Sequence, residues 1–371
     1  MKTIVVSAVN LNVGGTLKIL NECLKHLSGL NQNSEYRIVA LVYDKTLCQY
    51  PNIEYIETKW PKKRWINRLW YEYVSMKKIS VSLSPVDLWF SLHDTSPTVK
   101  VKKQAVYCHN SFFAYKWKMK DLLFAPKIAL FAMFTRYIYK KNINKNRYLV
   151  VQQNWFKKSM SEMFDLPLNK IIIFPPNQPH LKSTIKESDL ETKNSNVKSF
   201  VFPAAPDSHK NFEAILKAAE ILEKDHLGNS FEVVLTISGE ENAYTKWLRK
   251  KWNHLTCVRF VGYLSIRDLY RYYNGAEALI YPSKVESWGL PISEFLEFDK
   301  PMLLADLPYA YEAASGANKV AYFEPNNAIK LANMMASIIN GDTSFLKKQG
   351  EQKLEDPVVY NWNDLFSLLL K

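Results

Sequence analysis

The sequence is poor in cysteine and lacks any long apolar run. Its four cysteines, Cys23, Cys48, Cys108 and Cys257, are scattered with no C-x-x-C pair, which argues against a disulfide framework and against a zinc site. No apolar run approaches the roughly 20 residues that span a bilayer, and residues 4–9 lack the end of a cleaved signal peptide. We therefore expect a cytoplasmic protein whose contact with a membrane is at most peripheral.

A complete dinucleotide fingerprint is also missing. Gly14 and Gly15 follow a predicted strand at residues 3–7 and precede an amphipathic helix, but they do not form the full G-x-G-x-x-G pattern. Two interpretations of this pair stay open. It is either a tight turn that needs a positive φ or a loop that contacts a phosphate or an acceptor.

Length and charge bound the number of domains and the kind of partner. At 371 residues the chain is long for one ordinary core and suits two domains of moderate size. The formal net charge is +13. Such an excess indicates an anionic partner, for which nucleic acid, an anionic membrane face and phosphorylated substrates are the candidates.

Short apolar runs alternate with helical patterns in both halves of the chain, which predicts parallel α/β sheets. A polar and charged stretch at 177–198 separates the two series and is interpreted as a linker. We predict an N-terminal Rossmann-like domain at 1–176 and a C-terminal one at 199–345. A helical segment at 346–371 follows, and its packing against the N-terminal domain is left open.

The stretch 276–296 carries the strongest functional signal. Residues 276–281 read as a buried strand of a parallel sheet, and Gly289 and Pro291 mark a turn into a helix. A helix start at the carboxyl end of a parallel strand favours a phosphate. Glu286 and Glu294 flank it and can accept hydrogen bonds from sugar hydroxyls. The alternative is that Glu294 only complements the helix dipole and that Glu286 is a solvated loop acid. For Glu294 considered alone, the dipole interpretation is preferred. For the whole stretch, the ligand-binding interpretation is preferred.

Glu286 and Glu294, separated by seven residues that include Ser287-Trp-Gly-Leu-Pro291, resemble the E-x7-E signature of the retaining GT-B glycosyltransferases of family four (glycosyl transferases group 1). The resemblance implies an α/β GT-B fold of two Rossmann-like domains facing a central cleft. It also implies that Glu286 holds the donor sugar and Glu294 the nucleotide ribose. The donor diphosphate is then held by the loop amides, which are those of Ser287, Trp288, Gly289 and Leu290.

Lys210 ends a loop between the strand at 199–202 and a helix, where its ammonium is able to meet a diphosphate. The alternative is a solvated lysine at a helix start. The resemblance implies that the matching lysine binds donor phosphate together with an arginine several residues before it. Ala205 and Pro206 stand in that place, and His209 or a residue of the other domain is left open as the replacement. Gly239 follows the strand that begins at residue 231. This strand and its glycine resemble the segment of the family that lines the nucleotide base pocket.

In the N-terminal half, His109 stands at the carboxyl end of an apolar strand. On spacing alone it is assigned to structure, as a hydrogen-bonded loop residue. The resemblance implies instead a histidine beside the reacting sugar, and it implies that the loop of Gly14 and Gly15 faces the cleft. His93 and Asp94 occupy a similar strand end and are weaker candidates.

Two stretches, 60–71 and 115–141, interleave basic and aromatic residues. Such a face suits an anionic membrane surface, although nucleic acid can exploit the same chemistry. The alternative for each stretch is a solvated basic helix with its aromatic side chains in the core. The presence of both stretches in one half favours membrane contact.

Taken together, these patterns predict a retaining hexosyltransferase that moves a sugar from a UDP- or GDP-linked donor to a glycan acceptor. Because no D-x-D triplet is present, no metal and no cofactor besides the donor substrate are expected. The expected acceptor is a lipid-linked polysaccharide intermediate at the inner membrane face, with peripheral contact to anionic membrane and no nucleic acid. Two rivals are kept: a nucleotide-sugar epimerase on the same fold, and a basic non-enzymatic protein that binds nucleic acid or membrane.

Overall fold

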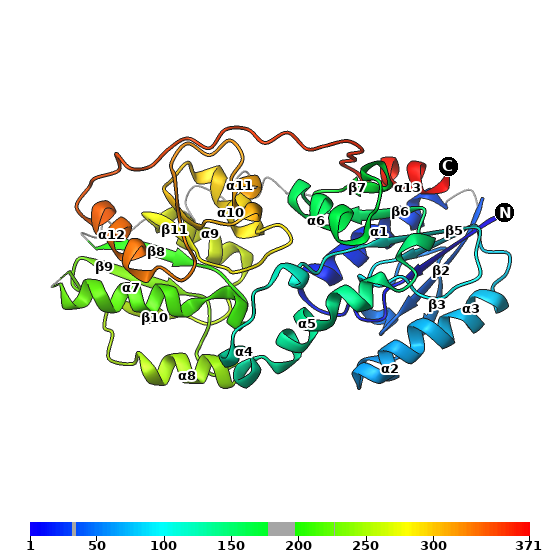
Figure 1. Ribbon diagram of the computed structural model, residues 1–371, viewed down its shortest axis with the longest axis horizontal. Coiled ribbons are helices and arrows are strands. Elements are labelled where there is room, and N and C mark those ends of the chain that lie inside the picture. The colour runs from blue at the N-terminus through cyan, green and yellow to red at the C-terminus, as the bar shows by residue number, and fades with distance from the viewer. Residues whose placement is uncertain (32–34, 177–196, 226) are drawn as a thin grey trace. The chain divides into compact units, whose positions relative to one another are not determined.

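The computed structural model describes residues 1–31, 35–176, 197–225 and 227–371. The chain divides into two compact units (Figure 1). The first comprises Met1–Ser111, Phe134–Asn177 and Leu354–Lys371, and the second comprises Phe112–Met133 and Gln178–Lys353. Each unit is built around one parallel sheet.

The first unit holds a seven-stranded parallel sheet in the order β3-β2-β1-β4-β5-β6-β7. Starting at β1 and moving outward, the order follows the doubly wound pattern, whose switch point lies between β1 and β4. Val5 of β1 stands opposite Val39 of β2 and Trp89 of β4, so the central strands are buried on both faces. The strands are β1 (Lys2–Ser7), β2 (Tyr36–Val42), β3 (Glu54–Glu57), β4 (Leu88–Ser91), β5 (Lys103–Tyr107), β6 (Tyr148–Val151) and β7 (Ile171–Ile173).

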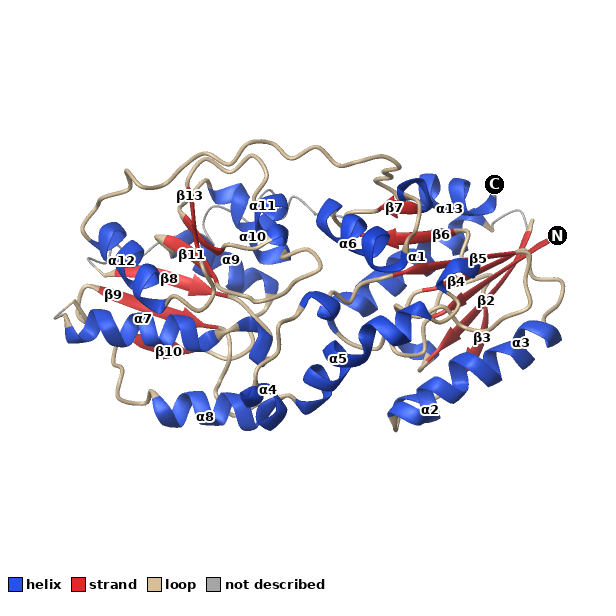
Figure 2. Ribbon diagram, in the orientation of Figure 1, coloured by secondary structure: helices blue, strands red, loops and turns tan. Residues whose placement is uncertain are grey.

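Helices cover this sheet on both faces (Figure 2). In α1 (Gly14–Leu30), Leu20, Cys23, Leu24 and Leu27 are buried, as their helical spacing predicts. A second helical segment of this unit consists of α2 (Trp65–Trp70), a π-helical turn (Tyr71–Ser75) and α3 (Met76–Ser82), which follow one another without a break. The other helices of this unit are α6 (Asn154–Phe164), the end of α5 (Pro126–Lys140) and α13 (Trp362–Leu370).

The C-terminal segment is fixed to the first unit by a buried amine. The Nζ of Lys157, a residue with no exposed surface, donates to the carbonyl oxygens of Glu355 (2.9 Å) and Asp356 (2.6 Å). Further along, Phe366 of α13 stacks on His26 of α1 at 5.6 Å between ring centroids. Residues 354–371 therefore pack on this unit, and its core includes Val359, Leu365, Phe366 and Leu369.

The second unit holds a six-stranded parallel sheet in the order β10-β9-β8-β11-β12-β13. This is again a doubly wound order, here with the switch point between β8 and β11. The strands are β8 (Lys198–Phe202), β9 (Phe231–Leu235), β10 (Val258–Phe260), β11 (Ala278–Tyr281), β12 (Met302–Ala305) and β13 (Val320–Phe323). The helices are α4 (Met119–Phe124), α7 (Phe212–Lys224), α8 (Ala243–Lys251), α9 (Ile266–Gly275), α10 (Leu290–Phe295), α11 (Pro308–Ala313) and α12 (Ala328–Ile339).

Residues 112–133 belong to the second unit although they lie inside the predicted N-terminal domain, 1–176. Their aromatic side chains explain the difference, because they pack on elements of the second unit. Phe112 meets the ring of His209 at 5.0 Å, and Phe124 meets that of Trp247 at 5.1 Å. A boundary drawn from the order of strands along the sequence does not detect such an exchange.

No helix among the described residues combines the length and the apolar character that crossing a bilayer requires.

Candidate functional site

Three loops meet at the carboxyl edge of the second sheet, where Asn211 ties them together. Asn211 lies in the left-handed region, at φ 63°, between β8 and α7. Its side-chain amide donates to the carbonyl oxygens of Pro282 (3.1 Å), after β11, and Pro325 (2.7 Å), after β13. In addition, the amide of Lys284 donates to the carbonyl of His209 (2.8 Å). The turn at 203–211 and the loop at 282–289 are thereby fixed to one another.

This arrangement brings together two predicted site residues that lie far apart in the sequence. The Nζ of Lys210 lies 2.6 Å from Oε1 of Glu286, and the two side chains are only 14% and 13% exposed. The hydroxyl of Tyr281 donates to the same oxygen at 3.0 Å. Lys210 and Glu286 are thus neither the solvated lysine nor the solvated loop acid that the alternatives described.

The turn after Glu286 requires glycine at position 289. Gly289 has φ +94° and precedes α10, and a Cβ there would lie 3.3 Å from Cδ1 of Ile292 and 3.4 Å from Cδ2 of Tyr309. Because α10 has only six residues and continues as a short 3-10 turn, its dipole is weaker than that of a long helix. Any anion held here depends mainly on the backbone amides of the turn.

Trp288 and Glu294 are both held by hydrogen bonds. The indole of Trp288 donates to Oγ of Ser293 at 2.9 Å. The hydroxyl of Tyr273, which is fully buried in α9, donates to Oε2 of Glu294 at 3.2 Å. Burial and the charge of Glu294 hold the pKa of Tyr273 well above its usual value, so this hydroxyl remains a donor. Glu294 is therefore oriented by α9 and does more than face the helix dipole.

Gly239, with φ +86°, lies at the carboxyl end of β9, where Arg249 leaves no room for a side chain. A Cβ would lie 2.6 Å from Cδ of Arg249. The amides of Ser238 and Gly239 both donate to the carboxylate of Glu241, the latter at 3.0 Å. The sequence interpretation missed Glu241, for which the only signal was its place two residues after the glycine.

His209 cannot supply the positive charge of the missing arginine near neutral pH. Burial, and then the charges of Lys210 and Lys284, lower the pKa of His209 well below its ordinary value, so the ring is neutral. The second nearby cation is Lys284. The pKa of Asp207 is raised, mainly because the carboxyl is buried. The charge of Lys210 lowers this pKa and the charge of Glu286 raises it. A second carboxylate therefore lies close to the Lys210–Glu286 pair.

In the first unit, His109 follows β5 at the carboxyl edge of the sheet. Its ring packs on Tyr107, with 4.1 Å between centroids, and its ring nitrogens are buried. Burial lowers the pKa of His109, although the charge of Asp94 and a hydrogen bond with the backbone of Leu92 act in the opposite direction. The role of His109 stays a prediction.

Gly14 and Gly15 stand exposed at the start of α1. Gly14 has φ +62°, whereas no positive φ is found at Gly15, and a Cβ at either position would have no atom within 4 Å. The tight turn with positive φ is therefore present at Gly14 alone.

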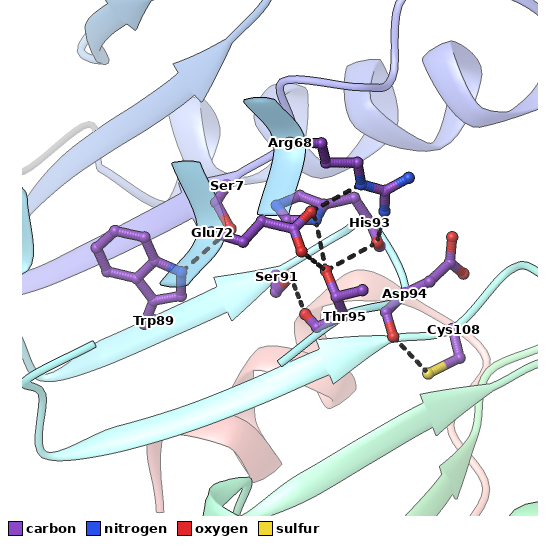
Figure 3. Close-up of polar contacts among 9 residues, drawn as sticks. All are labelled: Ser7, Arg68, Glu72, Trp89, Ser91, His93, Asp94, Thr95 and Cys108. Atoms are coloured by element: carbon purple, nitrogen blue, oxygen red, sulfur yellow. Dashed lines mark hydrogen bonds and ion pairs between the residues drawn. The ribbon is translucent and has the colours of Figure 1, made fainter. Parts of the chain in front are cut away.

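A buried charged network centred on Glu72 lies at the end of β4, and the sequence interpretation did not find it (Figure 3). Arg68 Nε donates to Oε1 of Glu72 at 2.8 Å, and Thr95 donates to Oε2 at 2.6 Å. Nδ1 of His93 lies 3.2 Å from Oε1 of the same glutamate. Arg68 and Glu72 stand four residues apart, a spacing that indicates a helical ion pair, but spacing does not reveal that Glu72 is fully buried.

The described residues contain no group of three or more His, Cys, Asp or Glu side chains placed to hold a metal ion.

Solved structures share this fold over most or all of the chain. Sucrose-phosphate synthase from Thermosynechococcus elongatus matches with a TM-score of 0.62 and 13% identity, covering 100% of this chain and 95% of that one. A glycosyltransferase from Rickettsia africae matches with a TM-score of 0.61 and 17% identity, covering 92% and 89%. Among characterised sequences, the O-antigen chain mannosyltransferase RfbU of Salmonella typhimurium is 19% identical over 321 residues, or 84% of this chain and 83% of RfbU.

The two doubly wound units and these likenesses define a glycosyltransferase with the GT-B fold, as the sequence predicted. Residues 183–355 match the model of the glycosyl transferases group 1. This part of the chain, a little under half of its length, is similar to that family.

Proposed function

We propose that the protein is a retaining, metal-independent hexosyltransferase that uses a UDP- or GDP-linked sugar and a glycan acceptor. The observation that carries this proposal is the Lys210–Glu286 pair at the carboxyl edge of the second sheet, beside the Gly289 turn. This unit would bind the nucleotide sugar, and the first unit would bind the acceptor. The donor is a substrate, and no further cofactor is proposed.

The donor would exchange the partners of this ion pair. Its diphosphate would take the ammonium of Lys210 and the amides of Ser287, Trp288, Gly289 and Leu290, which releases Glu286 to accept hydrogen bonds from the sugar hydroxyls. Glu294, already oriented by Tyr273, would accept from the ribose. As the glycosidic bond breaks, negative charge grows on the leaving diphosphate, so Lys210 and the amides stabilise the transition state more than the bound donor.

Retention of configuration would follow from attack on the face that the diphosphate leaves. The acceptor oxygen forms its bond to the anomeric carbon while the bond from that carbon to the phosphate oxygen breaks, and the departing phosphate takes the acceptor proton. His109 would lie beside the sugar. Because burial lowers its pKa, it would act as a neutral imidazole, which does not repel the positive charge that develops at the anomeric carbon.

The acceptor is proposed to be a lipid-linked polysaccharide intermediate at the inner face of the membrane. The relative named as an O-antigen chain mannosyltransferase supports a polysaccharide acceptor and makes GDP-mannose the first donor to test. Gly14, exposed at the start of α1, is a candidate contact on the acceptor side.

Peripheral contact with anionic membrane is part of the proposal, and α2 supports it. Trp65, Ile66 and Trp70 are 47%, 71% and 60% exposed, beside the cations Lys63 and Arg64. The second basic and aromatic stretch fits less well, because Tyr115 is buried. Its exposed large apolar side chains are instead Met119, Leu123, Leu130, Met133, Phe134 and Tyr137.

The deciding experiment is a donor screen followed by a transfer assay. A cognate nucleotide sugar should raise the melting temperature of the protein and should be consumed only when a glycan acceptor is present. Donor turnover without acceptor would favour an epimerase. A salt-dependent shift of nucleic acid with no nucleotide-sugar binding would favour a non-enzymatic protein.

A further inference from the structure

The loop after β4, residues 92–96, is held by hydrogen bonds next to the carboxylate of Glu72. Besides the bonds to Arg68 and Thr95, Arg68 Nη2 donates to the carbonyl of His93 at 2.9 Å. The hydroxyl of Ser91 donates to the carbonyl of Thr95 at 2.8 Å. In Figure 3 the side chains of Arg68, His93 and Thr95 converge on the carboxylate of Glu72.

Burying this network is unfavourable unless every charge has a partner. A buried ion pair contributes little to stability compared with apolar side chains of the same size, because desolvation offsets the attraction. Glu72 also lies in a π-helical turn, a distortion that occurs frequently at functional sites. Such a network indicates a neighbouring group whose position it fixes.

Asp94 is that group. It lies in the loop after β4, in the left-handed region, at φ 71°. Its Oδ1 accepts hydrogen bonds from the backbone amides of His109 (2.6 Å) and Asn110 (2.9 Å). The hydroxyl of Tyr139 donates to the carbonyl of Asn110 at 3.1 Å. The turn that follows β5 is thus held by the side chain of Asp94 on one side and by α5 on the other.

We propose that Asp94 is a positioning residue for His109: through its two amide bonds, and with its own loop held by Arg68 and Glu72, it sets where the imidazole stands beside the donor sugar. This inference rests on the proposed function, which places His109 there. Asp94 acts through the backbone of the turn and does not itself touch the sugar.

The proposal predicts a specific effect on the kinetics. Asp94 lies in the first unit, whereas the proposed donor ligands Lys210 and Glu286 lie in the second, so donor binding should not depend on Asp94. A displaced imidazole loses alignment in the transition state. Variants at Asp94 should therefore lower kcat and leave the KM for the donor unchanged.

Two variants separate the hydrogen bonds from the backbone conformation. Asp94→Asn tolerates the left-handed region and keeps a neutral acceptor, so kcat should fall roughly five-fold. Asp94→Gly also tolerates this region but has no acceptor, so kcat should fall between about ten-fold and about 100-fold. Asp165→Gly is the matched control, because Asp165 is an exposed aspartate of the same unit at φ 53°. It should retain the wild-type kcat.

The double variant His109→Ala/Asp94→Gly tests whether Asp94 acts through His109. It should be no slower than His109→Ala alone. Additive losses would overturn the positioning role and indicate that Asp94 meets the substrate itself. A wild-type kcat in folded Asp94→Gly would also overturn it. If Asp94→Gly does not fold, Asp94→Asn decides: an unchanged kcat overturns the inference, and a lower kcat at constant donor KM supports it.

The failure of the proposed function has a different signature. Wild-type turnover in His109→Ala would remove His109 from the reaction and with it the basis of this inference. A slow His109→Ala combined with a normal Asp94→Gly would overturn the role of Asp94 alone.

Discussion

The ammonium of Lys210 and the carboxylate of Glu286 lie 2.6 Å apart at positions 76 residues distant in the sequence. Each charge is neutralised by the other, in a place where both side chains are mostly buried. A phosphate that binds Lys210 must therefore compete with Glu286. Removing either residue affects both the stability of the site and its affinity for a donor.

Replacing Lys210 by Met or Glu286 by Gln should lower kcat roughly 100-fold, since each change removes a preorganised charge. Each single variant should also be less stable by about 1–3 kcal/mol, because a partly buried polar group is left without its partner. In the Lys210→Met/Glu286→Gln double variant the loss of stability should be smaller than the sum of the two losses. Urea unfolding and initial rates measure these effects. Near-normal turnover in either single variant would contradict the site assignment.

Stability should fall with acid in a manner that depends on Glu72. Burial acts to raise the pKa of Glu72, but Arg68 and the hydrogen bond from His93 lower it to about 2 from 4.5. A carboxyl with a lowered pKa stabilises the folded state above the unfolded value. That stabilisation, about 3 kcal/mol, should be lost as the pH falls from about 4.5 to about 2.

The matched variant for this prediction is Glu72→Gln. The difference in unfolding free energy between wild type and Glu72→Gln should shrink across that pH window and stay constant above it. If the difference does not change with pH, Arg68 does not stabilise the ionised carboxylate of Glu72 in the folded protein.

His209 should make the folded state less stable below neutral pH. Because burial, Lys210 and Lys284 lower its pKa well below 6.5, the unfolded chain takes up a proton there before the folded protein does. Stability contributed by the neutral ring is present above pH 6.5 and is lost as the pH falls. Wild type should therefore lose more stability than His209→Gln between pH 7 and pH 5. Parallel curves from thermal unfolding in this range would contradict a neutral His209.

Gly289→Ala should destabilise the protein by about 1–3 kcal/mol, because the positive φ strains any L side chain and the new Cβ crowds Tyr309. Gly341→Ala is the matched control. Gly341 has φ +80° but nothing within 4 Å of a Cβ, so only the backbone strain should appear. Gly289→Ala alone should also weaken donor binding in a thermal-shift titration. Equal losses of stability in the two variants would show that crowding at Gly289 is unimportant.

Binding to anionic vesicles should depend on α2. Trp65→Gln/Trp70→Gln should reduce co-sedimentation with vesicles that contain phosphatidylglycerol, and salt should weaken the binding of wild type. Tyr263→Gln is the control, since Tyr263 is 95% exposed but belongs to the second unit. Equal binding by all three proteins would remove α2 from the membrane proposal.

Much of the fold could be predicted from the sequence because apolar runs in a doubly wound sheet are local signals. The run that ends at Tyr281 is buried on both faces of its sheet, and the stripe from Leu20 to Leu27 faces the core. The exchange of residues 112–133 could not be predicted. It depends on the fit of Phe112 to His209 and of Phe124 to Trp247, which no periodicity records.

The candidate site was predicted where one short segment contains the residues and missed where several segments contribute. Glu286, Gly289 and Glu294 stand in one segment, so their spacing alone could be recognised. The support of His109 comes from Asp94 on one stretch of the chain and from Arg68 and Glu72 on another. These residues come together only at the edge of the folded sheet, so neither residue type nor sequence spacing predicts their association with His109.

The path of the backbone has a practical consequence for anyone who wishes to study half of this enzyme. The chain passes from one unit to the other at 111/112, 133/134, 177/178 and 353/354. A truncation after residue 177 would leave residues 112–133 without their aromatic partners and would remove the carbonyl oxygens to which the amine of Lys157 donates. Neither unit can be produced by cutting the chain once, so the function of individual residues has to be tested by point substitutions in the intact chain.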